Sequence, residues 1–221
     1  MPEPEASDTR SRILDAAEEI ARFKGLESLS MRAIAERIGL SAPAAYRHFR
    51  SKQEIVRAMI ERGHGRFVRG LEAARRGAEG PEALLAATAR YYLRFWVRDR
   101  SGFRLIAEWS RTEPALTGAA VEGGSFGDIP ALVAEILGGD RKPREAERIG
   151  RWTAATLYGM ALSLVQDEGI PRAREQEWIE SAADFLVGAV RAAASGRPSG
   201  GIYPAGHRES ARRNGRGRSE P

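Results

Sequence analysis

The chain has no cysteine, and this absence excludes disulfide bridges and thiolate metal sites. Only three histidines occur in 221 residues, His48, His64 and His207, and none of them forms an H-x-x-x-H or H-E-x-x-H pattern. Ser125 stands in a G-x-S-x-G sequence, but this glycine-rich segment predicts a loop, whereas a hydrolase nucleophile of this type needs a strand before it and a helix after it. We therefore expect no enzymatic activity, no cofactor and no metal.

Long apolar runs are also missing. No uninterrupted run approaches the roughly 20 residues that a membrane-spanning helix needs. The first residues, MPEPEASD, are acidic and polar, which is not typical of a signal peptide. The alternation of apolar and polar residues that marks a strand does not occur, whereas helical spacing recurs between glycine and proline positions. We expect an all-α protein of the cytoplasm with no membrane partner.

The most informative segment is SMRAIAERIGLSAPAAYRHFRSK, from Ser30 to Lys52. Ser30 is a good N-cap, and the residues after it place apolar side chains on one helical face. Gly39 stands where a helix needs a positive φ angle to reverse direction, and Ser41 can cap the helix that follows. This pattern predicts a helix-turn-helix, a motif that places its second helix in the major groove of duplex DNA.

The second helix of the motif has a narrow first turn, since Pro43 is flanked by alanines. Small side chains let a helix end approach base edges, while the longer side chains that follow supply polar reach. Pro43 has no donor and alanine offers only apolar contact, so direct readout has to rest mainly on Arg47, with Arg32 as a second candidate. Arg47 bound to a guanine is the sharpest hypothesis.

The next helix begins at a capping box, Ser51-Lys52-Gln53-Glu54. Lys52 stands at the positive end of this helix, where a cation gains nothing from the helix dipole. A phosphate in front of the helix would explain the choice of lysine. An ordinary solvated lysine is the alternative.

The net charge of +5 is small for this length, so its location matters more than its size. Between Met31 and Arg57 we count six cations against two anions. Most of the positive excess therefore lies on the motif.

These residues resemble the tetracycline-repressor-type (TetR) family of transcription regulators. The matching positions are Arg12-Ile13-Leu14-Asp15-Ala16-Ala17, Gly25, Ser30, Ile34-Ala35, Gly39, Ser41, Tyr46-Arg47-His48-Phe49 and Ser51-Lys52, which cover about the first quarter of the chain. The resemblance implies that phosphates are held by Ser30, Tyr46, His48 and Lys52, and that base edges face Ala42, Pro43, Ala44 and Arg47; Arg32 and Ser41 complete the candidate DNA-binding set.

Helical periodicity and Gly/Pro positions predict the remaining elements. We expect helices near residues 8–24, 51–76, 81–99, 129–137, 144–168 and 173–194, a shorter one beginning at Phe103, and a partly ordered loop over 112–128. Phe23 is expected on the apolar face of the first helix. The glycines of the 51–76 helix, Gly63, Gly65 and Gly70, predict either a bend or close packing on a neighbour.

The last two helices carry apolar stripes that are wider than one partner can cover. The resemblance implies that such a helix pair meets its copy in a four-helix bundle, so we expect a homodimer; the alternative is that both stripes belong to the core of one chain. The expected domains are a tail over 1–8, a DNA-binding domain over 9–54, an effector and dimerisation domain over 55–195, and a disordered basic tail over 196–221.

Aromatic residues are concentrated in the expected second domain. They predict either plain core or a pocket for a small apolar or aromatic effector. The candidate ligand-binding residues are Tyr91, Phe95, Trp96, Phe103, Trp109, Trp152, Thr156 and Met160.

The sequence thus predicts a dimeric repressor that leaves a palindromic operator when it binds its ligand. An activator with the same DNA contacts is one alternative, and a small-molecule-binding or scaffold protein with a vestigial helix-turn-helix is another. The tail, with six arginines and two glutamates, predicts either a nonspecific DNA-binding arm or, more simply, a solvated terminus.

Overall fold

The computed structural model describes residues 3–112, 128–138, 143–167 and 169–195, with the side chains of residues 8–108 and of the last three ranges. Regular structure in these ranges is helical, and no β-strand occurs in them. The predicted all-α class is confirmed. The predicted basic tail and nearly all of the predicted loop over 112–128 lie outside the described residues.

The N-terminal unit is built from α1 (Glu3–Lys24), the 3-10 turn η1 (Leu26–Ser28), α2 (Met31–Ile38) and α3 (Ala42–Tyr46). Ile13, Ala17, Ile34 and Phe49 are completely buried between these helices and the start of α4. The helical spacing of the apolar positions explains this core, since residues three or four apart share one face.

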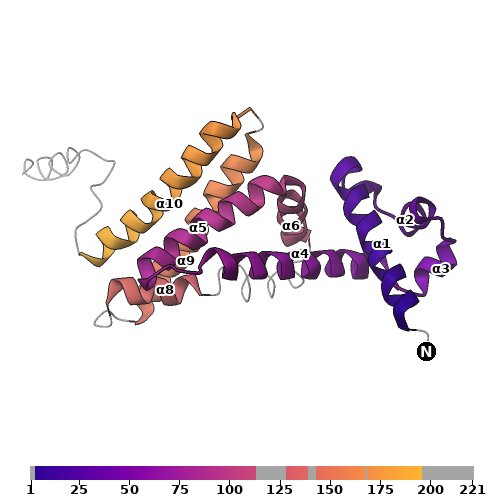
Figure 1. The fold of residues 1–221 in the computed structure, drawn as a ribbon, viewed down its shortest axis with the longest axis horizontal. Helices are drawn as coiled ribbons and strands as arrows, with labels where there is room; N and C mark the ends of the chain where they lie inside the picture. The colour runs from indigo at the N-terminus through magenta and orange to yellow at the C-terminus, as the bar shows by residue number, and fades with distance from the viewer. Residues whose placement is uncertain (1–2, 113–127, 139–142, 168, 196–221) are drawn as a thin grey trace, which may run out of the picture.

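The prediction for Phe23 is wrong. Its side chain is 75% exposed. The last turn of α1 projects beyond α4 and α2 (Figure 1), so a residue in register with the apolar face has no helix to pack against. The apolar face of α1 ends at Ile20.

Helix α4 (Lys52–Ala74) is long and continuous, and it connects the two halves of the molecule (Figure 1). Its first half contributes to the N-terminal core, and Phe67 and Leu71 in its second half belong to the C-terminal core. At Gly70, the structure shows close packing and no bend. A Cβ atom there would meet the Tyr91 side chain within 3 Å, so only glycine lets Tyr91 pack this closely on α4.

The C-terminal unit comprises α5 (Gly80–Arg98), α6 (Arg100–Thr112), α8 (Ile129–Leu137), α9 (Pro143–Gln166) and α10 (Arg172–Ala194). The predicted bounds agree within a few residues. Pro81 lies in the first turn of α5, where a missing N–H costs nothing, and Gly138 ends α8 at a φ of 76°.

Helices α9 and α10 lie side by side and pack on α5 and α8 (Figure 1). Their apolar stripes are divided. Leu157, Ala161, Ile179 and Leu186 are buried in the core, whereas other members of the same stripes, Trp152, Trp178 and Phe185, are 62%, 47% and 63% exposed.

Candidate functional site

The helix-turn-helix is fixed by its caps. The Ser30 Oγ accepts a hydrogen bond from the Ala33 N–H at 3.1 Å, and the Ser41 Oγ accepts one from the Ala44 N–H at 3.3 Å. Gly39 adopts the left-handed conformation, with a φ of 71°. The predicted positive φ at Gly39 and the two predicted serine caps are therefore present. Glycine is favoured at a positive φ, and the serine hydroxyls supply acceptors for N–H groups in the first turn of each helix.

The end of α3 presents a polar surface. Pro43, Tyr46 and Arg47 are exposed, Tyr46 at 51%, while Ala42, Ala44 and His48 are half-buried. Ala45 is completely buried and anchors this short helix to the core. The Arg47 guanidinium has no hydrogen bond or ion pair within the described ranges, so it is available to a ligand outside the chain.

Arg32 differs from Arg47, because it already has a partner. Its Nε donates to a Glu36 carboxylate oxygen at 2.8 Å, and both side chains are largely exposed. This hydrogen bond and the charge of Glu36 raise the pKa of Arg32. To contact a base, Arg32 would have to leave Glu36.

Lys52 is tied to the backbone of the N-terminal unit. Its Nζ donates to the carbonyl of Leu26 at 2.8 Å, and the side chain is half-buried. The Ser51 Oγ accepts from the Glu54 N–H at 3.2 Å, and a Glu54 carboxylate oxygen accepts from the Arg50 N–H at 2.7 Å. The ammonium group has three donors, so two remain after the bond to Leu26.

Two arginines of α1 hold the motif from behind. The Arg10 Nη1 donates to the carbonyl of His48 at 2.9 Å, and its guanidinium lies 4.0 Å from the centre of the Phe49 ring. The Arg12 Nη2 donates to the carbonyl of Ile38 at 3.1 Å. The sequence reasoning overlooked these two roles, since no local pattern shows which carbonyls a distant arginine will reach.

The predicted ligand-binding residues do not form one group. Phe95 and Trp96 line a pocket near α6, and Tyr91 and Phe95 line the groove beside it. Phe103 is buried and packs between Trp96 and Tyr158. The pocket has a cavity volume of about 50 Å³, whereas drug-sized ligands fill roughly 300–1,000 Å³.

The rest of that predicted set lies elsewhere. Trp152 and Thr156 are exposed on α9, and Met160 is half-buried beside the core. The side chain of Trp109 lies outside the described part of the chain. Phe67, which the sequence reasoning left out, is the centre of the aromatic cluster and contacts Tyr91, Tyr92, Phe95 and Trp96.

In the described part of the chain, no group of three or more histidine, aspartate or glutamate side chains is arranged to hold a metal ion. None of the helices placed in the structure combines the length and the apolar character that crossing a bilayer requires.

Comparison with known proteins agrees with this geometry. The model of the family "Bacterial regulatory proteins, tetR family" matches residues 13–59. The chain is 30% identical over 170 residues to the uncharacterized HTH-type transcriptional regulator Rv1255c of Mycobacterium tuberculosis, which covers 76% of this chain and 82% of that protein. It is 34% identical over 101 residues to the HTH-type transcriptional activator FasR of Mycolicibacterium smegmatis, a match that spans 46% of each protein, less than half of FasR.

Solved structures of two other proteins are similar to this chain over most of its length. A transcriptional regulator from Rhodococcus sp. Rha1 is 26% identical, with a TM-score of 0.65 over 82% of this chain and 95% of that one. The multidrug binding protein EbrR, complexed with malachite green, is 25% identical, with a TM-score of 0.61 over 84% and 98% of the two chains.

The fold, the capped motif and these comparisons thus define a transcriptional regulator with a helix-turn-helix DNA-binding domain and a helical second domain. The chain belongs to the tetR family of bacterial regulatory proteins.

Proposed function

We propose that this protein is a ligand-responsive repressor that acts in the cytoplasm and binds a palindromic operator as a homodimer. The observation that carries the proposal is the exposed end of α3, where Arg47, which has no side-chain partner among the described residues, follows a turn held by two serine caps. A rigid helix end with a free guanidinium suits direct readout of a guanine.

Phosphate contacts would fix the register of α3 in the groove. Ser30, Tyr46, His48 and Lys52 carry this role in the proposal, and Ala42, Pro43, Ala44 and Arg47 face the bases, with Arg32 released from Glu36 as a second reader. The hydrogen bonds of Arg10 and Arg12 to backbone carbonyls support this DNA-binding role. They fix the helix-turn-helix to α1 and leave the outer surface of the motif open to DNA. Residues 9–54 form the DNA-binding domain in this proposal, and residues 55–195 the effector and dimerisation domain.

The homodimer is supported by the outer faces of α9 and α10. Trp152, Trp178 and Phe185 are large apolar side chains exposed to solvent. Gly159 and Gly188 on the same helices have open space at their missing Cβ positions, which lets a second helix approach closely. A dimer is also what a palindromic operator needs, since its half-sites lie roughly 34–36 Å apart.

Ligand control is supported by the aromatic cluster around Phe67 and by EbrR, whose structure contains malachite green. An effector at this cluster would have to widen the present cavity. A tenfold loss of DNA affinity needs a coupling of only about 1.4 kcal/mol, which is ordinary for allostery.

An activator is the second candidate, because FasR is named as one. Both candidates use the same DNA contacts, so only transcription measurements separate them. A scaffold protein with a vestigial helix-turn-helix would show no preference among duplexes.

The test is selection from a random duplex library with the full-length chain, followed by gel shift at several salt concentrations. We expect a palindromic consensus and two chains per duplex. Recovery of random sequences, with equal affinity for every duplex, would rule out the proposed function. In vitro transcription from a promoter that carries the consensus then distinguishes repression from activation.

A further inference from the structure

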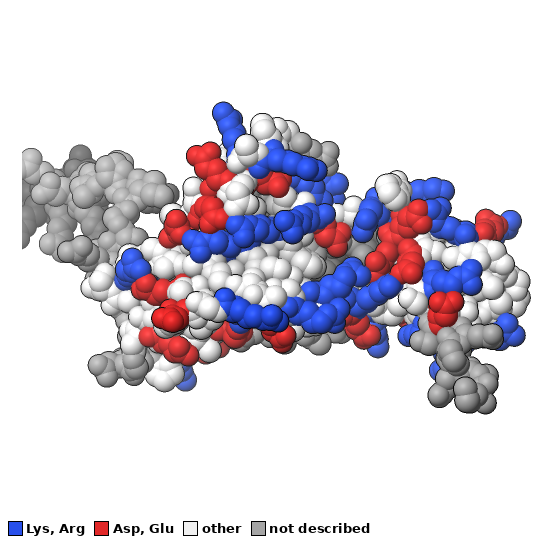
Figure 2. All heavy atoms as spheres, viewed as in Figure 1, with Lys and Arg blue, Asp and Glu red and all other residues white. Residues whose placement is uncertain are grey.

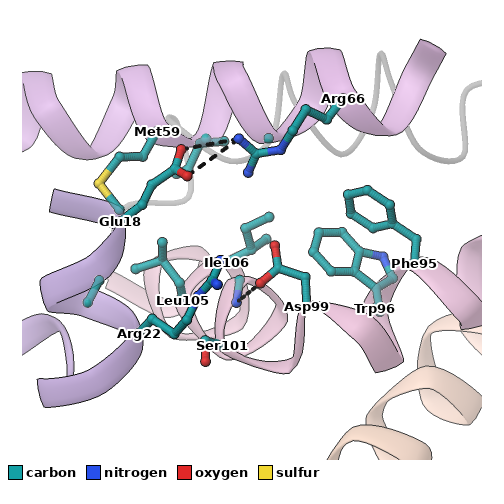
Figure 3. A pocket seen from close by; sticks show the side chains of 14 residues that line it. Glu18, Arg22, Met59, Arg66, Phe95, Trp96, Asp99, Ser101, Leu105 and Ile106 are labelled. Atoms are coloured by element: carbon teal, nitrogen blue, oxygen red, sulfur yellow. Dashed lines mark hydrogen bonds and ion pairs between the residues drawn. The ribbon is translucent and has the colours of Figure 1, made fainter. Parts of the chain in front are cut away.

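A pocket lies where the DNA-binding unit meets the C-terminal unit. Its lining comes from α1, α4, α5 and α6 (Figure 3). The apolar part of the lining is formed by Met59, Ile60, Phe95, Trp96, Leu105 and Ile106. In Figure 3, Phe95 and Trp96 close one end of the pocket, and the flat rings suit a planar apolar group.

The pocket continues into a groove of about 620 Å³ whose lining is mostly charged. Glu18, Arg22, Arg66, Phe95 and Asp99 line both spaces, so they form one continuous depression. The groove adds two more arginines, Arg94 and Arg98, to the shared pair. Figure 2 shows basic side chains gathered in the middle of the molecule, beside the N-terminal helices.

The groove has more positive than negative charge. Four arginines face two carboxylates. Arg66 pairs with Glu18 at 3.3 Å, and Arg94 pairs with Glu180 of α10. Arg22 and Arg98 have neither a hydrogen bond nor an ion pair with another described residue. Asp99 is used as the cap of α6, since its Oδ1 accepts from the Gly102 N–H at 3.0 Å.

We propose that this junction binds an aromatic carboxylate, with its ring at the apolar pocket and its carboxylate held by Arg22 and Arg98 in the groove. Arginine suits this role because its fork of donors matches a carboxylate. The site lies between the two units, where Phe95 and Trp96 of the aromatic cluster face the pocket. The inference names the effector class of the proposed ligand control, and it rests on the proposed function only for the effect on DNA.

The position of this pocket explains how a bound anion would affect the DNA-binding surface. Leu105 and Ile106 of α6 pack against the N-terminal core, and the Glu18–Arg66 pair joins α1 to α4. A ring inserted beside them separates α6 from α1. Because α1 holds the motif through Arg10 and Arg12, a shift of α1 moves α3 with it.

The binding test uses isothermal titration of the full-length chain without DNA. The probes are phenylacetate, phenylacetamide and phenethylammonium, which share a ring and differ in charge. We expect phenylacetate to bind at least about tenfold more tightly than either of the others, the size of one charge-assisted hydrogen bond. No binding of phenylacetate, or equal binding of the three probes, would overturn the proposal.

Two pairs of variants locate the site. Arg22→Gln with Arg98→Gln should weaken phenylacetate binding about tenfold or more, whereas Arg69→Gln with Arg76→Gln, which removes two exposed arginines outside the depression, should leave it unchanged. Gly63→Leu should fill the pocket and weaken binding to a similar degree. Gly65→Leu is its control, since Gly65 is also inside α4 but does not line the pocket.

Both leucine variants should keep or raise the melting temperature, because leucine favours a helix interior more than glycine does. A loss of binding in Gly63→Leu is then not a folding defect. Unchanged binding in Gly63→Leu and in the Arg22/Arg98 double variant would place the ligand elsewhere and overturn the proposal. Duplex binding is measured separately, so a chain that binds phenylacetate but no operator contradicts the proposed function and not the site.

Discussion

The Lys52 ammonium donates a hydrogen bond to the Leu26 carbonyl at 2.8 Å, and so connects the start of α4 to the turn that precedes α2. This bond holds the lysine at the positive end of a helix, next to the capped motif. A phosphate placed there would complete its hydrogen bonding. The proposed role therefore has two parts, one structural and one electrostatic, and experiments can separate them.

Lys52→Ala should weaken binding to all duplexes and flatten the plot of log K against log salt by about one unit. Fluorescence anisotropy over a series of salt concentrations measures the slope. The melting temperature reports the loss of the Leu26 bond independently. An unchanged slope, whatever happens to the melting temperature, would contradict the phosphate contact.

Arg47→Ala should cost about 1–3 kcal/mol of binding free energy and relax one position in each half-site. The guanidinium has no partner in the described part of the chain, so its removal leaves no buried group unsatisfied. Library selection with the variant measures the change, and Lys52→Ala, which should weaken binding without altering the consensus, is the comparison. If the variant recovers the same consensus as the parent chain, Arg47 does not read a base.

Charges placed on the exposed faces of α9 and α10 should separate the proposed dimer. Trp152→Glu with Phe185→Glu changes two side chains that are more than 60% exposed in one chain, so the fold should survive. Sedimentation equilibrium should give the mass of one chain instead of two. Phe23→Glu is the control, because Phe23 is 75% exposed on α1 and should not affect the mass. A dimer that persists in the double variant would place the interface elsewhere.

Thr88 should be important for stability. It is completely buried, its Oγ1 accepts from the Arg75 Nε at 2.8 Å and Nη2 at 2.7 Å, and its hydroxyl donates to the Leu84 carbonyl at 2.7 Å. Thr88→Val keeps the shape but removes the acceptor, which should cost about 1–3 kcal/mol of unfolding free energy. Urea denaturation measures it. Thr156→Val, at an exposed position of α9, should change stability by less than about 0.5 kcal/mol.

Alkaline pH should destabilise the chain through Tyr92. Burial raises the pKa of this tyrosine well above its ordinary value, because the phenolate is costly among Phe67 and Trp96. The folded state keeps the proton longer than the unfolded state, so this stability is present below about pH 10 and declines as the pH rises above it. Thermal melts across this range should show a smaller decline for Tyr92→Phe than for the parent chain. Tyr46→Phe, at an exposed position, should follow the parent, and identical curves for all three would refute the assignment.

Much of the fold was predictable, because its signals are local. Ser30, Gly39, Ser41 and Ser51 act through bonds that span three or four residues, and these are the bonds that the structure contains. Pro81 and Gly138 mark helix ends for the same reason. The exposure of Phe23 was not predictable from periodicity, since a period gives the face of a helix and not the length of its neighbour.

The DNA-binding residues and the ligand-binding residues illustrate the same difference. The DNA-binding residues lie within one short segment, so the sequence pattern was enough to identify them as a group. The aromatic residues come from several helices, and their spacing in the sequence did not show that Trp152 points to solvent while Phe95 and Trp96 line the junction.

By itself, the sequence determined the all-helical class, the capped helix-turn-helix and the positions of the helix ends, because each depends on neighbouring residues along one chain. Only the tertiary structure decided that Arg10 and Arg12 hold the motif, that Tyr91 covers Gly70, and that arginines from α1, α4 and α5 surround one depression. These relationships join residues far apart in the chain, and the packing of whole helices sets the distances between them.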